Sequence, residues 1–471
     1  MTEPNVRRLS FGVAVFGVGY WVLCVAGRIG SAWPLEWMEG ASAVHALRLL
    51  RGLPLYAAPR ADFVPFVYPP LSYLPMGLGL FASGGALWGA RLASVLGVVL
   101  CGAALWRAGK QVSGTHAAGA FAVGLFAMGY GYTGGFIDLA RVDAWFCALS
   151  LCGVERLCAR RHLVGMLLLA LACFAKQHAV LLLVAASGGV WLVQGRGGLR
   201  AIIVSWLAFS ACIAALGVWS DGWIWAYCVT VPARHGLEPQ LLLSFVLVDL
   251  CVYLPLLTGL CAYFVVTRRD PSSRLLSLLL LAAIAASALG RAHPGGDDNV
   301  RLPACALSAL VAGISVCDLL VTRPRMRWPL TAALALQLVM LFQPPTLYWP
   351  TQQTEERFAQ LKAELTRCAG SNDFAAMDHV GLGEHAFVHA LALSDLRLNE
   401  DDLAEQATRA VLAALRAPTG SAPRAVAISS SFPALMTALA ERYELCARTP
   451  AMALPTGYPL SETFIYRRKA E

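Results

Sequence analysis

Long hydrophobic runs, separated by short polar segments, dominate the first 343 positions of the chain. A helix needs about 20 mostly apolar residues to cross a bilayer. A further apolar run, 71–83, is too short to span and contains Pro75, so it predicts a helix lying in or dipping into the interface. The pattern predicts an α-helical polytopic membrane protein with about eleven spans: 11–30, 87–106, 117–134, 144–159, 163–176, 178–194, 201–219, 244–266, 275–290, 303–321 and 328–343.

Basic residues orient the predicted spans. If the N-terminus lies in the cytoplasm, every predicted cytoplasmic loop is basic, with clusters that include Arg107, Arg160, Arg196, Arg268 and Arg325. This distribution follows the positive-inside rule, and counting 71–83 as a span would invert it. We therefore expect a cytoplasmic N-terminus and an extracytoplasmic C-terminus. The first run is expected to be a retained helix, with a cleaved signal peptide as the alternative.

The tail, residues 344–471, has a different pattern and is expected to form a small extracytoplasmic α/β domain after the transmembrane domain of residues 1–343. Two of its cysteines, Cys368 and Cys446, could pair if the tail faces an oxidising compartment. The pattern alternates helical stretches with short apolar runs: 354–368, 400–416 and 433–443 for helices, 374–380, 425–429 and 463–466 for strands.

The amino-acid composition also favours a membrane protein over a soluble one. Of the 471 residues, 58% are hydrophobic and 14% are charged, whereas soluble domains carry about 25% charged residues. The net charge of +8 follows from the basic cytoplasmic loops and gives no reason to expect a nucleic-acid partner. No Cys or His spacing is typical of a metal site, so no protein-held metal is predicted.

The first predicted outer loop, residues 31–86, is much longer than the usual connection of about 4–6 residues. It is rich in acids, aromatics and prolines. Glu36 and Glu39 are candidate functional acids, since charge at a helix–loop border in the membrane is costly without a role. Tyr68 and its aromatic neighbours are candidate substrate contacts. The alternative is an interfacial belt of aromatics that anchors the helices at the headgroups.

The second predicted outer loop, residues 134–143, carries three charges at the mouth of a helix: Asp138, Arg141 and Asp143. They could form a structural ion pair, Arg141 with either acid. A paired aspartate stays ionised, so it can still orient a hydroxyl or accept a proton. The pattern therefore leaves both a structural and a catalytic role open.

Cations on the predicted outer side suit a phosphate group. Lys176 interrupts an apolar run in FAKQHA, and Arg291, His293 and Arg301 surround a Gly-Gly turn in GRAHPGGDDNVRLPA. Lysine is a compact point charge suited to phosphate. A lysine that extends to the interface from a helix end is the alternative for Lys176, and isolated histidines such as His293 are more often structural.

Four segments in order resemble the polytopic GT-C glycosyltransferases, in the branch of the protein O-mannosyltransferases and the aminoarabinose transferases (glycosyltransferase family 39-like). They are WMEGASAVHALRLLRGLPLY with FVYPPLSYL, then GGFIDLARVDAWF, FAKQHA and HPGGDDNVRLPA. The resemblance covers about residues 1–345. It implies an inverting sugar transfer from a polyprenyl-phosphate donor, at a site outside the membrane. The arginine-rich composition favours a bacterial source, so we expect the site to face the periplasm or exterior of the inner membrane.

The resemblance also implies roles for the acids of the outer loops. The family's catalytic base falls on Glu39, with Glu36 as the second choice, because this chain has Met38-Glu39 where the family commonly has two acids. The second-loop acid falls on Asp143, with Asp138 as its close competitor.

Among the cations, the family's phosphate-binding role falls on Lys176, and more weakly on Arg291 or Arg301. A lipid, a glycan or a protein can be the acceptor. A divalent cation stays open as a cofactor, since some relatives need one. The alternative classes are a lipid or solute transporter or flippase, and a non-catalytic scaffold for the tail.

Overall fold

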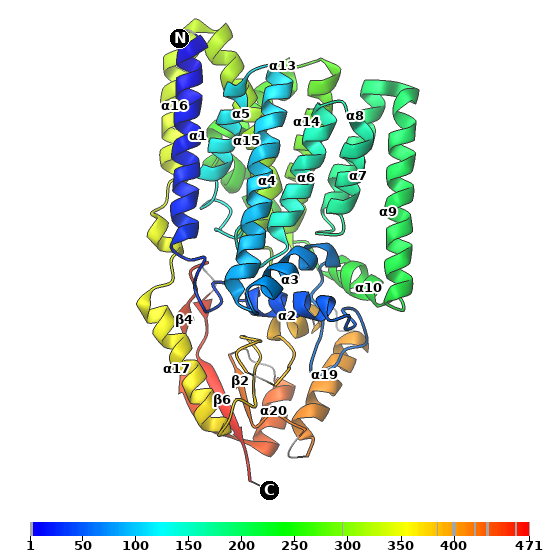
Figure 1. The fold of residues 1–471 in the computed structure, drawn as a ribbon, viewed down its shortest axis with the longest axis vertical. Coiled ribbons are helices and arrows are strands. Elements are labelled where there is room, and N and C mark those ends of the chain that lie inside the picture. The colour runs from blue at the N-terminus through cyan, green and yellow to red at the C-terminus, as the bar shows by residue number, and fades with distance from the viewer. Residues whose placement is uncertain are drawn as a thin grey trace. The chain divides into compact units, whose positions relative to one another are not determined.

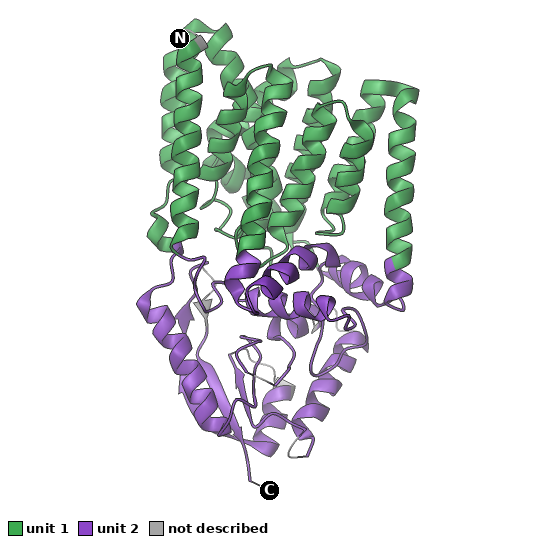
Figure 2. Ribbon diagram, viewed as in Figure 1, with its two compact units in different colours: residues 1–27, 92–215, 236–347 green, residues 28–91, 216–235, 348–471 purple. Residues whose placement is uncertain are grey.

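The structure is a computed structural model that describes residues 3–293, 295–383, 385–397, 402–418, 421–429, 433–456 and 459–470. The chain divides into two compact units, coloured separately in Figure 2. Unit 1 comprises residues 1–27, 92–215 and 236–347, and unit 2 comprises residues 28–91, 216–235 and 348–471.

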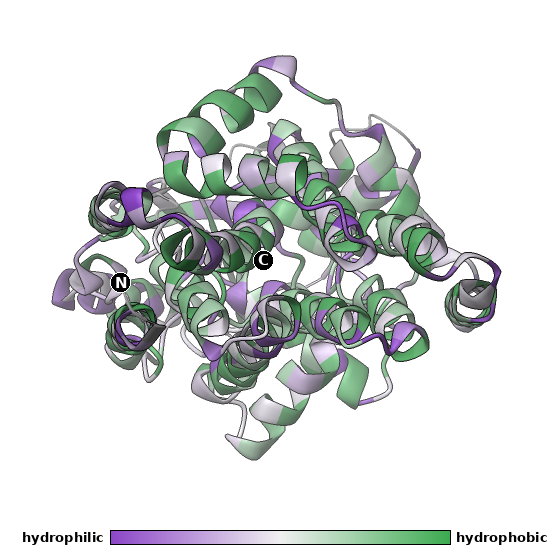
Figure 3. Ribbon diagram, turned by 90° about the horizontal axis from the view of Figure 1, so that it is seen from above, coloured by the Kyte–Doolittle hydropathy of each residue, from purple (hydrophilic) through white to green (hydrophobic). Residues whose placement is uncertain are grey.

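Unit 1 is built from helices (Figure 1). Their sequences are the apolar runs described above, and most helical turns seen from above are hydrophobic (Figure 3). The helices that lie wholly or mainly in unit 1 are α1 (Glu3–Ala26), α4 (Leu87–Ser113), α5 (His116–Met128), α6 (Asp143–Cys158), α7 (His162–Ala172), α8 (Ala179–Gln194), α9 (Leu199–Trp219), α12 (Pro239–Ser244), the π-helix η4 (Phe245–Val252), α13 (Pro255–Thr267), α14 (Pro271–Ala292), α15 (Leu302–Thr322) and α16 (Arg327–Leu341), with short 3-10 turns η2 (Gly195–Gly198), η5 (Asp298–Arg301), η6 (Pro324–Met326) and η7 (Pro345–Tyr348).

Six helical segments of the described chain are long and apolar enough to cross a membrane, or seven if one bent helix pair is counted as a span. Three shorter apolar helices, α5, α7 and α13, overlap expected spans. The expected span 244–266 is divided at residues 253–254 into η4 and α13. The chain is therefore an integral membrane protein with the expected helical architecture. The number of eleven spans and their orientation stay predictions.

Small residues bring the helices of unit 1 close together, as is common in membranes. A Cβ atom on Gly17 of α1 would collide with the carbonyl oxygen of Gly124 of α5. A Cβ atom on Gly109 of α4 would lie 2.8 Å from the backbone of Gly119 of α5. Helix α15 lies at the centre of the unit, with 83% of its most apolar window buried.

The connection between α5 and α6 differs from the expected span 117–134, because α5 ends at Met128. Glycines at 129, 131, 134 and 135 follow, and Gly134 and Gly135 adopt φ of 68° and 67°. Only glycine adopts this left-handed conformation readily, so the backbone leaves the helix here. The resulting connection, residues 129–142, delivers Asp143 to the first position of α6.

The first part of unit 2 contains α2 (Glu39–Leu50), the 3-10 turn η1 (Pro70–Ser72) and α3 (Tyr73–Ala82). The segment expected at 71–83 is thus a short helix. It packs on α2, since a Cβ atom on Gly77 would lie 2.8 Å from Leu50 Cγ. Residues 216–235 add α10 (Trp223–Trp225), the π-helix η3 (Ala226–Thr230) and α11 (Val231–Arg234).

The tail forms the α/β part of unit 2. Its mixed sheet has the strand order β1-β2-β6-β3, with β1 and β2 parallel and the remaining pairs antiparallel. The expected helices and strands are confirmed with small shifts of their ends, although residues 400–401 of the expected helix 400–416 lie outside the described residues. The elements are α17 (Gln352–Ala369), β1 (Phe374–Ala376), α18 (Ala390–Arg397), α19 (Asp402–Arg416), β2 (Ala425–Ile428), α20 (Pro433–Arg442), β3 (Tyr443–Thr449), β4 (Met452–Ala453), β5 (Pro459–Leu460) and β6 (Thr463–Arg468).

One hydrophobic core holds the tail together. Phe358, Leu361 and Leu365 of α17 are fully buried against the sheet, in the i, i+3, i+7 spacing of one helix face. The indole of Trp33 stacks on Phe358 with ring centroids 5.5 Å apart. A disulfide joins Cys368 at the end of α17 to Cys446 in β3.

Candidate functional site

Asp143 is the centre of a buried charged network in unit 1. Its Oδ1 accepts a 2.8 Å hydrogen bond from Lys176 Nζ and a 3.1 Å hydrogen bond from Asn299 Nδ2. Its Oδ2 accepts a 3.2 Å hydrogen bond from Arg141 Nε. The Asp143 side chain is fully buried, and Lys176 and Arg141 are only 5% and 6% exposed.

Three separate segments supply this network. Arg141 and Asp143 come from the glycine-rich connection 129–142 and the start of α6, and the connection is fixed by a 2.6 Å hydrogen bond from Ser94 Oγ to the carbonyl of Leu139. Lys176 lies between α7 and α8, and Asn299 lies in η5. Two cations therefore converge on one carboxylate, and such cations are suited to bind an anionic group.

Asp138 has a different environment from Asp143. Its Oδ1 accepts a 2.9 Å hydrogen bond from the hydroxyl of Tyr130, and its side chain is buried. Arg141 pairs with Asp143, which is one of the two ion pairs considered from the sequence. The guanidinium of Arg141 also lies 5.0 Å from the ring centroid of Phe136.

A second charged cluster in unit 1 surrounds Asp249 of the π-helix η4. Asp249 Oδ1 lies 3.2 Å from Arg301 Nη2, and its Oδ2 lies 3.5 Å from Arg291 Nε. Arg301 also pairs with Asp298 at 2.6 Å and donates a 2.9 Å hydrogen bond to the carbonyl of Tyr132. The structure thus brings Arg291 and Arg301 together. The half-buried His293 follows α14 directly.

In unit 2, Glu39 forms a buried two-pronged ion pair. Arg91 donates from Nε to Glu39 Oε1 at 3.0 Å and from Nη2 to Glu39 Oε2 at 2.8 Å. Glu39 Oε2 also accepts a 2.7 Å hydrogen bond from the backbone nitrogen of Leu35. Both side chains have no exposed surface.

The same arginine anchors the start of the segment 31–86, the predicted first outer loop. Arg91 Nη1 donates to the carbonyls of Ile29 and Ser31, and Nη2 donates to the carbonyl of Trp33. Every polar nitrogen of the guanidinium is therefore used. Arg91 holds both Glu39 and the backbone of residues 29–33 in one arrangement.

The remaining first-loop candidates are also held by backbone contacts. Glu36 is buried, and its Oε2 accepts a 2.8 Å hydrogen bond from the nitrogen of Met38. The carbonyl of Tyr68 accepts a 2.6 Å hydrogen bond from the hydroxyl of Tyr56. Both residues therefore help to fix the shape of the loop.

Sequence reasoning did not find Arg91 or Asn299. A signal for Arg91 was present, since it is a charged residue inside an expected span, where charge is rare and usually functional. Asn299 had no such signal, because it lies in a polar turn among other polar residues. Among the described residues there is no group of three or more His, Cys, Asp or Glu side chains that could hold a metal ion.

The sequence matches no protein-family model and no curated protein. Solved structures do match. ArnT from Cupriavidus metallidurans bound to undecaprenyl phosphate has a TM-score of 0.60 at 12% identity, over 98% of each chain. The oligosaccharyltransferase AglB from Archaeoglobus fulgidus, in complex with an inhibitory peptide and a dolichol-phosphate, has a TM-score of 0.56 at 9% identity, over 89% of this chain and 69% of AglB. Another structure of that oligosaccharyltransferase, a complex with Zn and sulfate, has a TM-score of 0.51 at 10% identity.

The similarity to these solved structures shows the fold of the chain. The chain has a GT-C glycosyltransferase-like fold, as the resemblance of its sequence motifs indicated.

Proposed function

We propose that this protein is a membrane glycosyltransferase that moves a sugar from a polyprenyl-phosphate donor to an extracytoplasmic acceptor with inversion. The observation that carries the proposal is the GT-C likeness over 98% of the chain, to a structure that holds undecaprenyl phosphate. The buried network of Asp143, Lys176 and Arg141 adds support, because a polyprenyl-phosphate donor brings an anionic group that needs cations.

In this proposal Lys176 and Arg141 bind the donor phosphate. Asp143 orients both cations, since it accepts a hydrogen bond from each. As the bond between C1 of the sugar and the phosphate oxygen breaks, negative charge develops on the leaving phosphate, and fixed cations stabilise that charge. Arg291 and Arg301 are weaker candidates for binding the phosphate, because both form ion pairs with Asp249.

Glu39 is proposed as the base, with Glu36 as the second choice. The acceptor hydroxyl attacks C1 from the face opposite the phosphate while its proton passes to the carboxylate, and the anomeric centre is inverted. Arg91 holds both oxygens of Glu39, so one of these hydrogen bonds must be exchanged for the acceptor hydroxyl. Arg91 is therefore proposed to orient the Glu39 carboxylate.

The site is proposed to face the periplasm or exterior of a bacterial inner membrane. A lipid, a glycan or a protein can serve as acceptor. Dependence on a divalent cation is tested directly, by comparing turnover before and after treatment with a chelator.

The experiment that tests the function is sugar release from polyprenyl-phosphate donors by purified protein, for wild type, Glu39→Gln and Lys176→Met. We expect donor-dependent turnover in the wild type, loss of turnover in Glu39→Gln, and weaker donor use in Lys176→Met. Full activity of Glu39→Gln would remove the assignment of the base. An unchanged apparent donor affinity in Lys176→Met would remove the phosphate role.

Asp249 favours a second candidate function, a lipid or solute transporter. This acid is 2% exposed and lies in a π-helix within an apolar segment, paired with two arginines. Buried ionisable residues inside spans mark transport pathways in many membrane proteins. Movement of a labelled lipid-phosphate across reconstituted vesicles, lost in Asp249→Asn and without sugar transfer, would favour this function.

A further inference from the structure

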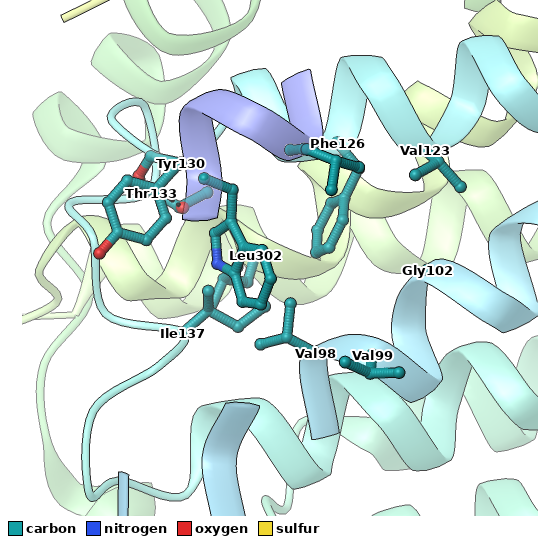
Figure 4. Close-up of a pocket in the computed structure, with 12 residues that line it drawn as sticks. Val98, Val99, Gly102, Val123, Phe126, Tyr130, Thr133, Ile137 and Leu302 are labelled. Atoms are coloured by element: carbon teal, nitrogen blue, oxygen red, sulfur yellow. Dashed lines mark hydrogen bonds between the residues drawn. The ribbon is translucent and has the colours of Figure 1, made fainter. Parts of the chain in front are cut away.

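Unit 1 contains a cavity that the proposed mechanism does not use. It has a volume of about 140 Å³ and is lined by α1, α4, α5, the connection 129–142 and the first residue of α15. Figure 4 shows Tyr130 and Thr133 at one end of the cavity and Val123 and Gly102 toward the other. A Cβ atom on Gly102 would have no neighbour within 4 Å, so the cavity has free space beside α4.

The wall of the cavity is almost entirely apolar. The hydroxyl of Tyr130 donates to Asp138, and the hydroxyl of Thr133 donates to the carbonyls of Gly129 and Tyr130. The indole nitrogen of Trp21 is the one further side-chain polar atom among the described lining residues, and it has no hydrogen-bond partner. Among the described residues that line the cavity, none carries a charge. Such a wall favours a hydrocarbon ligand over a polar one.

The mouth of the cavity lies on spanning helices. Val18 of α1 is 38% exposed and Val99 of α4 is 55% exposed, and both helices are long and apolar enough to cross the membrane. Exposed valines on such helices face lipid, because the outside of a membrane span is hydrocarbon. The cavity therefore opens to the acyl chains of the bilayer.

We propose that this cavity is a lipid-binding site that holds one acyl chain of a bilayer phospholipid. A polyprenyl phosphate is the less suitable occupant, because the wall lacks the cation that would select a phosphate group. Phospholipid acyl chains are also the most abundant hydrocarbon at the mouth, so mass action favours them. The proposal is independent of the transferase activity.

The site has a direct connection to the charged network. Tyr130 lines the cavity and binds Asp138, and Ile137 of the same connection lines it as well. That connection ends at Arg141 and Asp143. A bound chain packs against the connection and thereby supports the position of both charged residues.

The test is photolabelling of the full-length protein in nanodiscs by a phosphatidylethanolamine with a diazirine on its acyl chain, followed by mass spectrometry of the labelled peptides. We expect labelling of peptides from α1, α4 and α5 in the wild type. Gly102→Leu fills the cavity and should reduce this labelling several-fold. Gly12→Leu is the matched control, because Gly12 is an exposed α1 glycine with the same open space around its Cβ and does not line the cavity.

Two outcomes would overturn the proposal. The first is equal labelling of these peptides in Gly102→Leu and in wild type. The second is displacement of the phospholipid label by an equimolar amount of polyprenyl phosphate, which would identify the chain as that of a prenyl lipid. If Gly102→Leu does not fold, Gly102→Ala is used, because its methyl group fills a smaller part of the same space. Labelling of the α1, α4 and α5 peptides in Gly102→Ala should then be lower than in wild type without being lost.

Discussion

Lys176 and Asp143 form a 2.8 Å ion pair inside unit 1, and both side chains are buried. Burying two charges is costly, so the pair is stable only while each charge keeps its partner. Arg141 adds a second cation to the same carboxylate. Because one carboxylate contacts two cations, we expect the protein to lose more stability when the carboxylate is removed than when one cation is removed.

Asp143→Asn should destabilise the protein more than Lys176→Met. The first change removes the carboxylate that both cations contact, whereas the second leaves Asp143 paired with Arg141. Breaking a buried pair costs about 3–5 kcal/mol, which is the scale expected for Asp143→Asn. Thermal unfolding of the purified variants measures the difference, with the exposed Lys110→Met as control. Equal losses of stability in both variants would contradict the arrangement.

The double variant Asp143→Asn/Lys176→Met provides a second check. Residues in one ion-pair network couple, so the loss of stability in the double variant should be smaller than the sum of the two single losses. Strict additivity would show that the two side chains do not interact in the folded protein.

Arg91→Lys should lower kcat with little change in the KM for donor. A lysine keeps the positive charge but cannot donate two parallel hydrogen bonds to Glu39, so the carboxylate loses its direction. Comparing kcat and KM in Arg91→Lys, Arg91→Met and wild type separates this effect from a general loss of folding. Unchanged kcat in Arg91→Lys would remove the positioning role.

The sequence predicts the tail well because its helices follow ordinary amphipathic spacing. Phe358, Leu361 and Leu365 fall on one face of α17, which the pattern of residues 354–368 already indicates. Strand β3 was not predicted. Its residues, Tyr443–Thr449, mix exposed polar and apolar positions at the edge of the sheet, so no clear alternation marks them.

The candidate site is only partly readable from the sequence. The spacing of Asp138, Arg141 and Asp143 allows two ion pairs, and it does not show that Asp143 also accepts from Lys176 and Asn299. The pairing of Glu39 with Arg91 joins residues 52 positions apart. Such a contact follows from the packing of two segments, which hydrophobic patterns do not specify.

Loss of the Cys368–Cys446 disulfide should destabilise the tail. The bond joins α17 to β3 across 78 residues, and removing a native disulfide from a small domain typically costs about 2–5 kcal/mol. Dithiothreitol should lower the unfolding temperature of wild type, but not that of Cys368→Ser/Cys446→Ser. The exposed Cys212→Ser is the control. Identical melting of wild type with and without the reductant would contradict the prediction.

Buried histidines in unit 2 should make the protein less stable in acid. Burial lowers the pKa of His45 to about 3 and those of His379 and His389 to about 4. The geometry agrees for two of them. His45 Nε2 accepts from the nitrogen of Phe66 while Nδ1 contacts the carbonyl of Ala41, and His389 Nδ1 accepts from the nitrogen of Leu391. A second proton on either ring would break one of these bonds.

The sign of the effect follows from proton binding. Between pH 4 and the unfolded value of about 6.5, each of the three histidines binds a proton in the unfolded chain and not in the folded one, so stability rises with pH. Asp395 acts in the opposite direction, since burial raises its pKa to about 7 and the folded chain keeps its proton over the same range. With three groups against one, stability should increase from pH 5 to 6.5 and level off above it, as the histidines of the unfolded chain lose their protons.

Thermal unfolding of the purified protein at pH 5, 6 and 6.5 measures this dependence. His389→Gln should reduce the slope by the contribution of one proton, about 1.4 kcal/mol per pH unit at most. His116→Gln is the matched control, because His116 is exposed and not buried as the other three rings are. A wild-type melting temperature that does not vary over this range would show that the buried rings accept protons without loss of their hydrogen bonds.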